Sequence, residues 1–129
     1  MSYCLQRLPG GVYKKFSGVV DVAEYMVSST EVANLPDYAD LRFSINDFSG
    51  IDGYKASHLE MTNVIAMDMG VRERNPDIQL AIIATDAKLL ALIRKLYQSA
   101  TGYRIDYFAT LAEAQDGLSR KLGFPVVVG

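Results

Sequence analysis

The stretch 41-LRFSINDFSG-50 decides the fold of this chain. Its alternating apolar and polar side chains predict a β-strand at residues 41–48, with Phe43 and Ile45 on one face and a more polar face opposite. The strand ends in a turn at residues 47–50 that leads towards a helix. Ligands and partners meet the carboxyl ends of strands in an open α/β sheet, so we expect the functional surface at this turn.

The composition indicates one folded domain spanning residues 1–129. Half of the residues are hydrophobic (50%) and 22% are charged, as in ordinary globular proteins. A net charge of -2 and a pI of 5.3 argue against a broad nucleic-acid-binding face. No apolar run reaches the roughly 18 residues of a membrane helix, and no signal peptide is recognisable, so membrane insertion is not expected. One cysteine cannot form an internal disulfide, and we expect a cytoplasmic protein.

Two strands are predicted before the stretch. They lie at residues 3–8 and 12–17, joined by a Pro-Gly-Gly turn typical of a hairpin, and Gly18 ends the second strand. Lys14 and Lys15 indicate that the second strand lies near a sheet edge, because lysine discourages further strand pairing.

A helix is expected to follow this hairpin. Asp21 and Glu24 form a capping box at its start, and Pro36 requires the helix to end by Leu35. Its inward face is expected to comprise Val22, Tyr25, Met26 and Ser29.

Two further strands and three further helices are predicted after the stretch. They are a helix at 54–69 capped by Gly70, a strand at 78–84, a helix at 87–100, a strand at 104–109 and a helix at 111–122 that starts with a Thr110–Glu113 capping box and ends at Gly123. The strand at 78–84 is the most apolar and is placed centrally. The helix at 87–100 is apolar over a wide face, which indicates either deep burial or a second partner surface. Residues 124–129 form a short apolar tail.

The predicted order is β-β-α-β-α-β-α-β-α, which defines an α/β fold. We expect a single-layer, mixed and mostly parallel five-stranded sheet, with an antiparallel N-terminal hairpin and four helices.

This order resembles the STAS-type anti-sigma-factor antagonist fold, and specifically the SpoIIAA-like family of small bacterial proteins. Residues 13–20, 43–50 and 80–122 carry the resemblance. It implies a non-enzymatic regulatory module that forms a homodimer or binds another regulatory protein. Association through apolar helix faces is expected, and the tail is a candidate for adding a strand to another sheet edge. The related CRAL-TRIO lipid carriers imply an alternative, a small carrier that holds a lipid or other apolar ligand between helices and sheet.

One family motif is altered here. Phosphorylatable STAS proteins open the helix after the turn with Asp-Ser-Ser-Gly, and a partner kinase modifies a serine there. The corresponding residues of this chain resemble Lys55-Ala56-Ser57-His58. A phosphate on Ser57 would still meet the unpaired N–H groups of a helix N-terminus, with Lys55 nearby, but the motif itself is broken.

Two candidate surfaces follow from these patterns. The candidate interaction or switch surface comprises Asp47, Ser49, Lys55, Ser57 and His58. The candidate apolar partner or ligand face comprises Met61, Ile65, Met69, Leu89, Ile93 and Tyr97. Its methionines are consistent with core packing or with an adaptable partner surface.

No catalytic, cofactor-binding or metal-ligating residues are predicted. Asp47 resembles the aspartate of a receiver domain, but the acidic pair and the lysine that this chemistry needs are missing, so Asp47 is expected to bond its own turn amides. His58 is expected to be a surface histidine, and one histidine with one cysteine cannot build a zinc site of those ligands.

Overall fold

A computed structural model describes residues 2–98 and 104–129 of the chain, without the side chains of Ser2, His58, Ile65, Asp68, Arg72, Leu96 and Gln98. The strands are β1 (Ser2–Leu8), β2 (Gly11–Asp21), β3 (Phe43–Asp47), β4 (Ile51–Lys55), β5 (Gln79–Ile83) and β6 (Arg104–Phe108). The helices are α1 (Val22–Ala33), α2 (His58–Arg74), α3 (Ala87–Gln98) and α4 (Leu111–Leu122), with a 3-10 turn η1 at Tyr38–Asp40.

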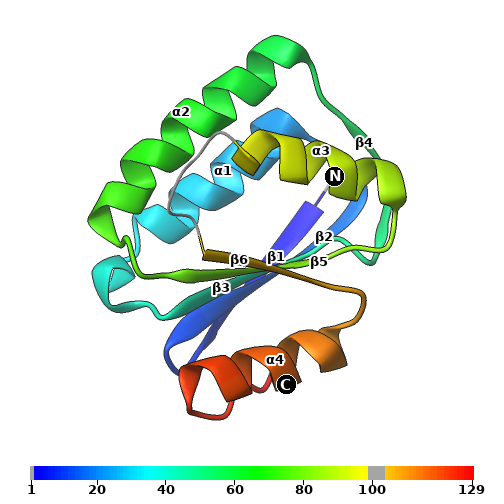
Figure 1. Ribbon diagram of the computed structural model, residues 1–129. Coiled ribbons are helices and arrows are strands. Elements are labelled where there is room, and N and C mark those ends of the chain that lie inside the picture. The colour runs from blue at the N-terminus through cyan, green and yellow to red at the C-terminus, as the bar shows by residue number, and fades with distance from the viewer. Residues whose placement is uncertain (1, 99–103) are drawn as a thin grey trace.

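The sheet has the order β1-β2-β3-β5-β6, and β4 also pairs with β2. β1 and β2 form the predicted antiparallel hairpin, and the other described pairings are parallel. The central position of β5 is confirmed. Helices α1, α2 and α3 cover one face and α4 covers the other (Figure 1), so the predicted mostly parallel α/β architecture is confirmed.

The prediction of five strands was one short, because β4 was missed. Residues 51–55 had been divided between a tight turn at Gly53 and the start of a helix, but they pair in parallel with residues 18–21 of β2. A five-residue strand with a central glycine shows too little alternation to be recognised from its own sequence. As a result α2 starts at His58 instead of residue 54, and Gly70 lies inside it.

Gly18 does not end β2, contrary to the prediction. Its φ of 71° is in the left-handed region, and the register with β4 shifts between Gly18 and Val19. Glycine adopts this conformation without steric strain, so β2 continues through it to Asp21. The extra residue of the irregular pairing, Asp52, lies on β4. The continuation is the part of β2 with which β4 pairs.

The N-caps of the two predicted capping boxes, Asp21 and Thr110, are confirmed. The Asp21 side chain accepts a hydrogen bond from Glu24 N at 2.8 Å, and Thr110 Oγ1 accepts one from Glu113 N at 3.1 Å. The buried residues of α1 are Ser28, Val32 and Ala33, which corrects the predicted inward face.

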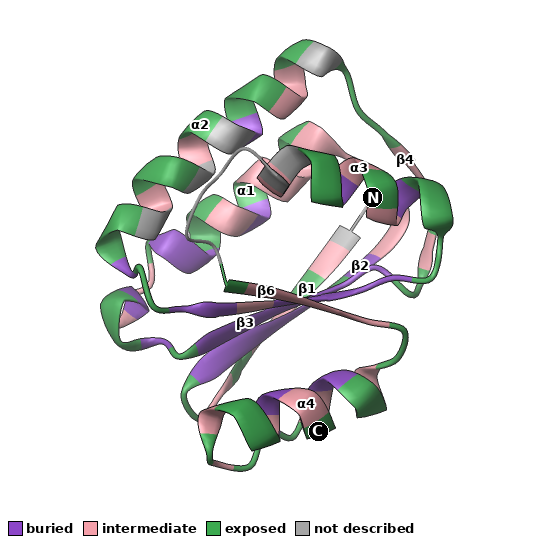
Figure 2. Cartoon of the chain, viewed as in Figure 1, coloured by how far each residue is buried: buried purple, intermediate pink, exposed green. Residues whose placement is uncertain are grey.

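Each face of the sheet has its own core, because alternate side chains of a strand point to opposite faces. The core under α4 is formed by Tyr13, Phe43, Ile45, Ala81, Ile83, Ala114, Leu118 and Val126. The core under α3 includes Phe16, Val20, Phe48, Ile82, Leu89 and Ile93. Figure 2 shows the buried central strands between the two helical layers. No helix among the described residues is both long and apolar enough to cross a membrane.

The apolar tail packs on its own domain. Val126 is buried, its N–H donates to Ser119 Oγ at 2.9 Å, and Val128 N donates to Gln115 Oε1 at 2.7 Å. These amides are therefore used within the chain and are not available to pair with another sheet edge.

We expect Val126→Ala to lower the free energy of unfolding by about 2 kcal/mol, because it removes two buried methyl groups and leaves a cavity. Urea unfolding followed by circular dichroism measures the change. Val127→Ala is the matched control, since Val127 is 66% exposed. An equal loss in both variants would contradict the packing of the tail.

Candidate functional site

The carboxylate of Asp47 organises the turn after β3. Its Oδ1 accepts hydrogen bonds from Ser49 N at 2.9 Å and Ser49 Oγ at 2.6 Å, and its Oδ2 accepts one from Tyr13 OH at 2.5 Å. The predicted bond between Asp47 and its own turn amide is confirmed. Asp47 is only 2% exposed, so its assignment to a contact surface was wrong: it supports the surface from below.

The exposed part of the predicted surface runs from this turn along β4 to the start of α2. We call it the turn–β4 surface, and its exposed residues are Ser49, Gly50, Asp52, Lys55, Ala56, Ser57 and Leu59. Leu59 is 71% exposed, and the predicted interaction surface did not include it. The side chain of His58 lies outside the described residues.

Ser57 caps the N-terminus of α2 through a reciprocal capping box. Its Oγ accepts a hydrogen bond from Glu60 N at 3.2 Å, and its own N–H donates to Glu60 Oε1 at 3.3 Å. The Ser-x-x-Glu spacing was present in the sequence, but the helix had been predicted to begin earlier. A phosphate on Ser57 would displace this cap and lie beside the Glu60 carboxylate.

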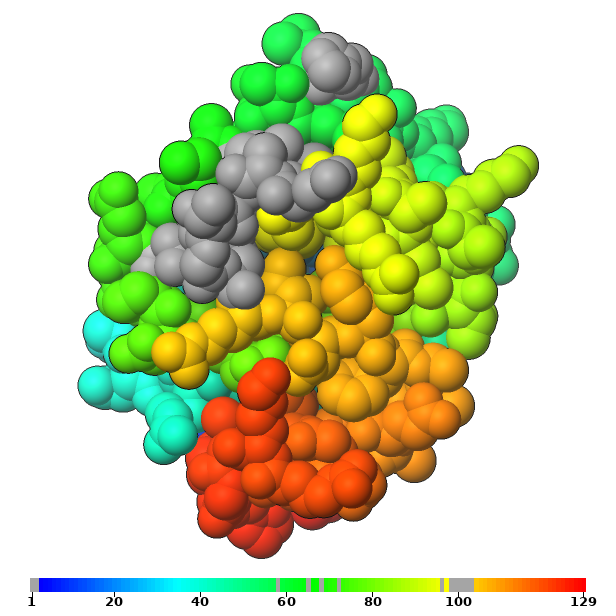
Figure 3. Space-filling model, viewed as in Figure 1, coloured from blue at the N-terminus to red at the C-terminus, as the bar shows by residue number. Residues whose placement is uncertain are grey.

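The predicted apolar face is divided in the structure. Leu89 and Ile93 are buried, and Tyr97 is half-buried, so this side of α3 packs on the sheet. Met69 points outward and is 56% exposed, Met61 is half-buried, and the Ile65 side chain is outside the described residues. Burial of Leu89 and Ile93 therefore accounts for part of the apolar character of α3. Figure 3 shows α3, β6 and α4 side by side on one face.

An apolar pocket lies between the sheet, β4 and α3. Its walls include Val20, Tyr25, Phe48, Tyr54, Ile93 and Tyr97, and its volume is about 70 Å³. Pockets for drug-sized ligands measure roughly 300–1,000 Å³. The volume of this pocket is therefore well below that range.

A second pocket, of about 60 Å³, shares the walls Tyr25 and Tyr97 with the first. It is lined by polar side chains of the sheet, Lys14, Ser44 and Asn46. Lys14 is only 2% exposed, and β2 is paired on both sides, so the prediction that Lys14 protects a sheet edge was wrong. Its side chain is covered by α1, where Ser28 Oγ accepts a hydrogen bond from Lys14 Nζ at 3.1 Å, and local sequence does not reveal this contact.

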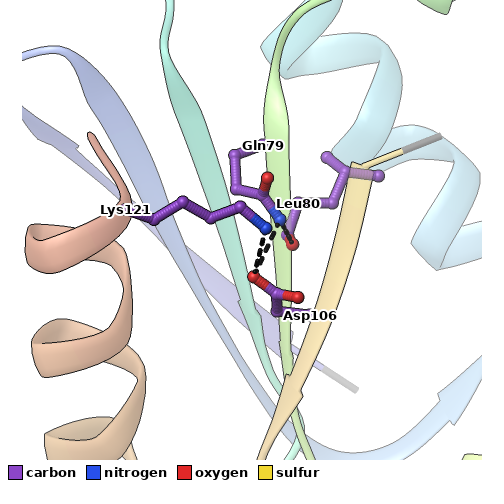
Figure 4. Close-up of polar contacts among 4 residues, drawn as sticks. All are labelled: Gln79, Leu80, Asp106 and Lys121. Carbon is purple, nitrogen blue, oxygen red and sulfur yellow. Dashed lines mark hydrogen bonds and ion pairs between the residues drawn. The ribbon is translucent and has the colours of Figure 1, made fainter.

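On the opposite face, a polar network connects α4 to the sheet (Figure 4). Asp106 Oδ2 accepts hydrogen bonds from Lys121 Nζ at 2.9 Å and Gln79 Nε2 at 3.3 Å. Gln79 Nε2 also donates to the Leu80 carbonyl at 3.1 Å. These bonds satisfy a glutamine that is 2% exposed, and their role is structural. The described residues contain no group of three or more histidine, cysteine or acidic side chains that could hold a metal ion.

The arrangement of strands and helices matches that of known structures. The anti-sigma factor antagonist SpoIIAA in its unphosphorylated form matches with a TM-score of 0.60 and 14% sequence identity, over 91% of this chain and 97% of SpoIIAA. The chain has the SpoIIAA-like fold. The phosphorylated form of SpoIIAA, a Bacillus cell fate determinant, gives a TM-score of 0.59 and 15% identity, over 91% of this chain and 99% of that one.

A third structure has the same SpoIIAA-like fold. It is an uncharacterised protein of the DUF3478 family from Shewanella loihica PV-4, and it matches with a TM-score of 0.58 and 16% identity, over 91% of this chain and 92% of that one. No family model matches the chain, and no curated protein matches its sequence. The fold implied by the sequence resemblance is confirmed.

Tyr13→Phe is expected to lower the free energy of unfolding by about 1–3 kcal/mol at neutral pH, because it leaves a buried oxygen of Asp47 without its donor. Urea unfolding measures the loss. Tyr54→Phe on β4 is the control, since the Tyr54 hydroxyl is not bonded to Asp47. A Tyr13→Phe variant as stable as the control would contradict the role of the bond.

The same bond predicts a dependence on pH. Burial, followed by the hydrogen bond to Asp47, raises the pKa of Tyr13 above its ordinary value of 10. A raised folded-state pKa gives stability that is present below about pH 10 and is lost as the pH rises further. Wild type should therefore lose stability more steeply than Tyr13→Phe above pH 10, as measured by urea unfolding. An equally steep loss of the free energy of unfolding in both proteins would show that Tyr13 is not the source of this pH dependence.

Proposed function

We propose that this chain is a non-catalytic regulatory module that binds another protein through the turn–β4 surface. The observation that carries the proposal is the turn held by Asp47. Ser49 donates both its N–H and its hydroxyl to this buried carboxylate, which is fixed from the other side by Tyr13. A surface ordered before binding loses less conformational entropy when a partner docks.

Leu59 supplies the apolar anchor of the proposed interface. Its side chain is 71% exposed, and the exposed polar residues Lys55 and Ser57 precede it. Apolar anchors surrounded by polar groups contribute most of the binding free energy in many interfaces. The SpoIIAA-like fold supports this proposal, because SpoIIAA is an anti-sigma factor antagonist. A cytoplasmic location is part of the same proposal.

We further propose that this surface acts without a phosphoserine switch. The Ser49 hydroxyl donates to Asp47 at 2.6 Å, so a phosphate there would remove the donor and place two anions together. Ser57 is engaged by Glu60, which would likewise repel a phosphate. Both serines serve the local fold through their hydroxyl groups.

Site-specific photo-crosslinking in the native host tests the interface. A photoreactive residue at position 59 should give a discrete adduct with a partner protein, and the same residue at position 27 should not. Val27 is a matched control because it is an aliphatic side chain, 61% exposed, on α1. Mass spectrometry of the adduct distinguishes another regulatory protein from a second copy of this chain, which would indicate the homodimer. The same adducts at both positions, or none at position 59, would refute the interface.

Leu59→Ser should weaken binding of the crosslinked partner by about tenfold, as expected when an interface anchor is removed. Titration with the purified partner measures the change. Val27→Ser should leave the affinity unchanged, and an equal effect of the two substitutions would contradict the assignment of Leu59.

Intact-mass analysis of the chain purified from its host tests the absence of the switch. The expected mass is that of the unmodified sequence. A covalent increment of one phosphate mapped to Ser49 or Ser57 would show that the switch exists.

A further inference from the structure

A polar groove lies at the amino ends of three parallel strands, at the other end of the sheet from the turn–β4 surface. Its walls include Arg42, which precedes β3, Gln79 at the start of β5 and Arg104 at the start of β6. Its volume is about 530 Å³, within the roughly 300–1,000 Å³ of ligand pockets. None of the exposed residues of the turn–β4 surface lines it, so the proposed interface leaves this groove unused.

Hydrogen bonds hold two walls of the groove together. Asn75 Nδ2 donates to the carbonyls of Tyr38 and Leu41, at 2.8 Å in each case. The N–H of Gln79 donates to the Arg42 carbonyl at 2.9 Å. These bonds fix the segment before β3 against the segment that enters β5, so the side chains that the two segments contribute to the groove are neighbours.

Two buried amide side chains line the groove. Asn75 is 5% exposed and Gln79 is 2% exposed. The two N–H groups of Asn75 Nδ2 are used on carbonyl oxygens, and those of Gln79 Nε2 are used on the Leu80 carbonyl and on Asp106 Oδ2 (Figure 4). Since all four partners are acceptors, the orientation of both amides is fixed. No described residue donates to Asn75 Oδ1 or Gln79 Oε1, so both oxygens are available to a ligand that carries N–H donors.

Most of the charged groups at the groove are paired within the chain. Arg104 forms an ion pair with Asp77 at 3.3 Å, and Lys121 forms one with Asp106 at 2.9 Å. These exposed pairs balance each other in charge, so they favour neither a cation nor an anion as the ligand.

One charge of each sign is left over in the groove wall. Asp40 and Arg42 both line the groove, and neither forms an ion pair with a described residue. The guanidinium of Arg42 lies 5.7 Å from the ring centroid of Phe124, which restricts its position. Leu41, between the two, has an extended backbone, and residues two apart in an extended chain have Cα atoms roughly 6.6 Å apart. A ligand that contacts both side chains therefore carries a cation and an anion a short distance apart.

We propose that this groove binds an α-amino acid as its zwitterion. The ammonium group donates to Asn75 Oδ1, to Gln79 Oε1 and to the Asp40 carboxylate. The carboxylate of the ligand accepts from the Arg42 guanidinium. The nitrogen and the carboxylate carbon of an α-amino acid are about 2.5 Å apart, so one molecule fits between these neighbouring groups. The remaining volume has polar walls, which suit a polar amino-acid side chain.

L-Glutamine, glutaramate and L-glutaminamide are the probes, because glutaramate lacks only the ammonium group and L-glutaminamide lacks only the carboxylate. Amide chemical-shift titrations of the full chain measure the three affinities. L-Glutamine should bind with a Kd of about 1 mM, and each of the others about tenfold more weakly, for one lost charged contact. Absence of L-glutamine binding at about 10 mM, or equal affinity for all three probes, would overturn the proposal.

Two variants assign the charged contacts. Arg42→Gln should weaken L-glutamine binding about tenfold and leave L-glutaminamide binding unchanged, because that probe has no carboxylate. Asp40→Asn should also weaken L-glutamine binding, and it should leave glutaramate binding unchanged, because that probe has no ammonium group. Both residues are exposed, so neither substitution is expected to disturb the fold.

Arg120→Gln and Asp116→Asn are the matched controls, since these exposed residues of α4 do not line the groove. Both variants should bind L-glutamine as the wild type does. An equal fall in affinity in the controls and in the groove variants, or unchanged L-glutamine binding in Arg42→Gln, would refute the site.

Discussion

The carboxylate of Asp47 is the constraint on which the rest of the structure depends. It is bonded by Tyr13 from β2 and by Ser49 from the turn, so it joins two strands to the segment that leaves the sheet. Because the turn is fixed there, the chain returns to β2 three residues later as β4. The position of β4 in turn determines where α2 begins and which residues of the turn–β4 surface face solvent.

Apolar and polar side chains alternate along β3, so the two faces of the sheet differ in polarity. Phe43 and Ile45 fill a well-packed core beneath α4, whereas Ser44 and Asn46 lie beneath the three-helix layer. Lys14 from β2 joins these polar side chains. Both described pockets that adjoin Tyr25 therefore lie in the three-helix layer.

Sequence reasoning succeeded in several places where the signal was local. The Asp21 and Thr110 caps and the apolar strand β5 were all recognisable from a few neighbouring residues. It failed where pairing with distant residues decides the outcome. Gly18 resembles a strand end because its neighbours do not reveal that β4 pairs beyond it. Two adjacent lysines resemble an edge strand because they do not reveal that β2 also pairs with β3.

The sequence located the turn that the candidate site contains, but it identified only some of the exposed residues of the turn–β4 surface. The turn after β3 was correctly located, because strand ends can be inferred from the alternating pattern and its glycine. The burial of Asp47 could not be inferred, since it depends on Tyr13, which is 34 residues away. The exposure of Leu59 and the polar pocket likewise follow from packing between elements that are distant in sequence.

The attachment of β4 has a consequence for how the molecule fluctuates. Among the described residues β4 pairs only with the last part of β2, whereas β3 and β5 are each paired on both sides. Segments with fewer partners open at a lower free energy than the whole domain unfolds, and hydrogen exchange reveals them as early-exchanging units. We therefore expect the amides of β4 and of the start of α2 to exchange before those of the central strands.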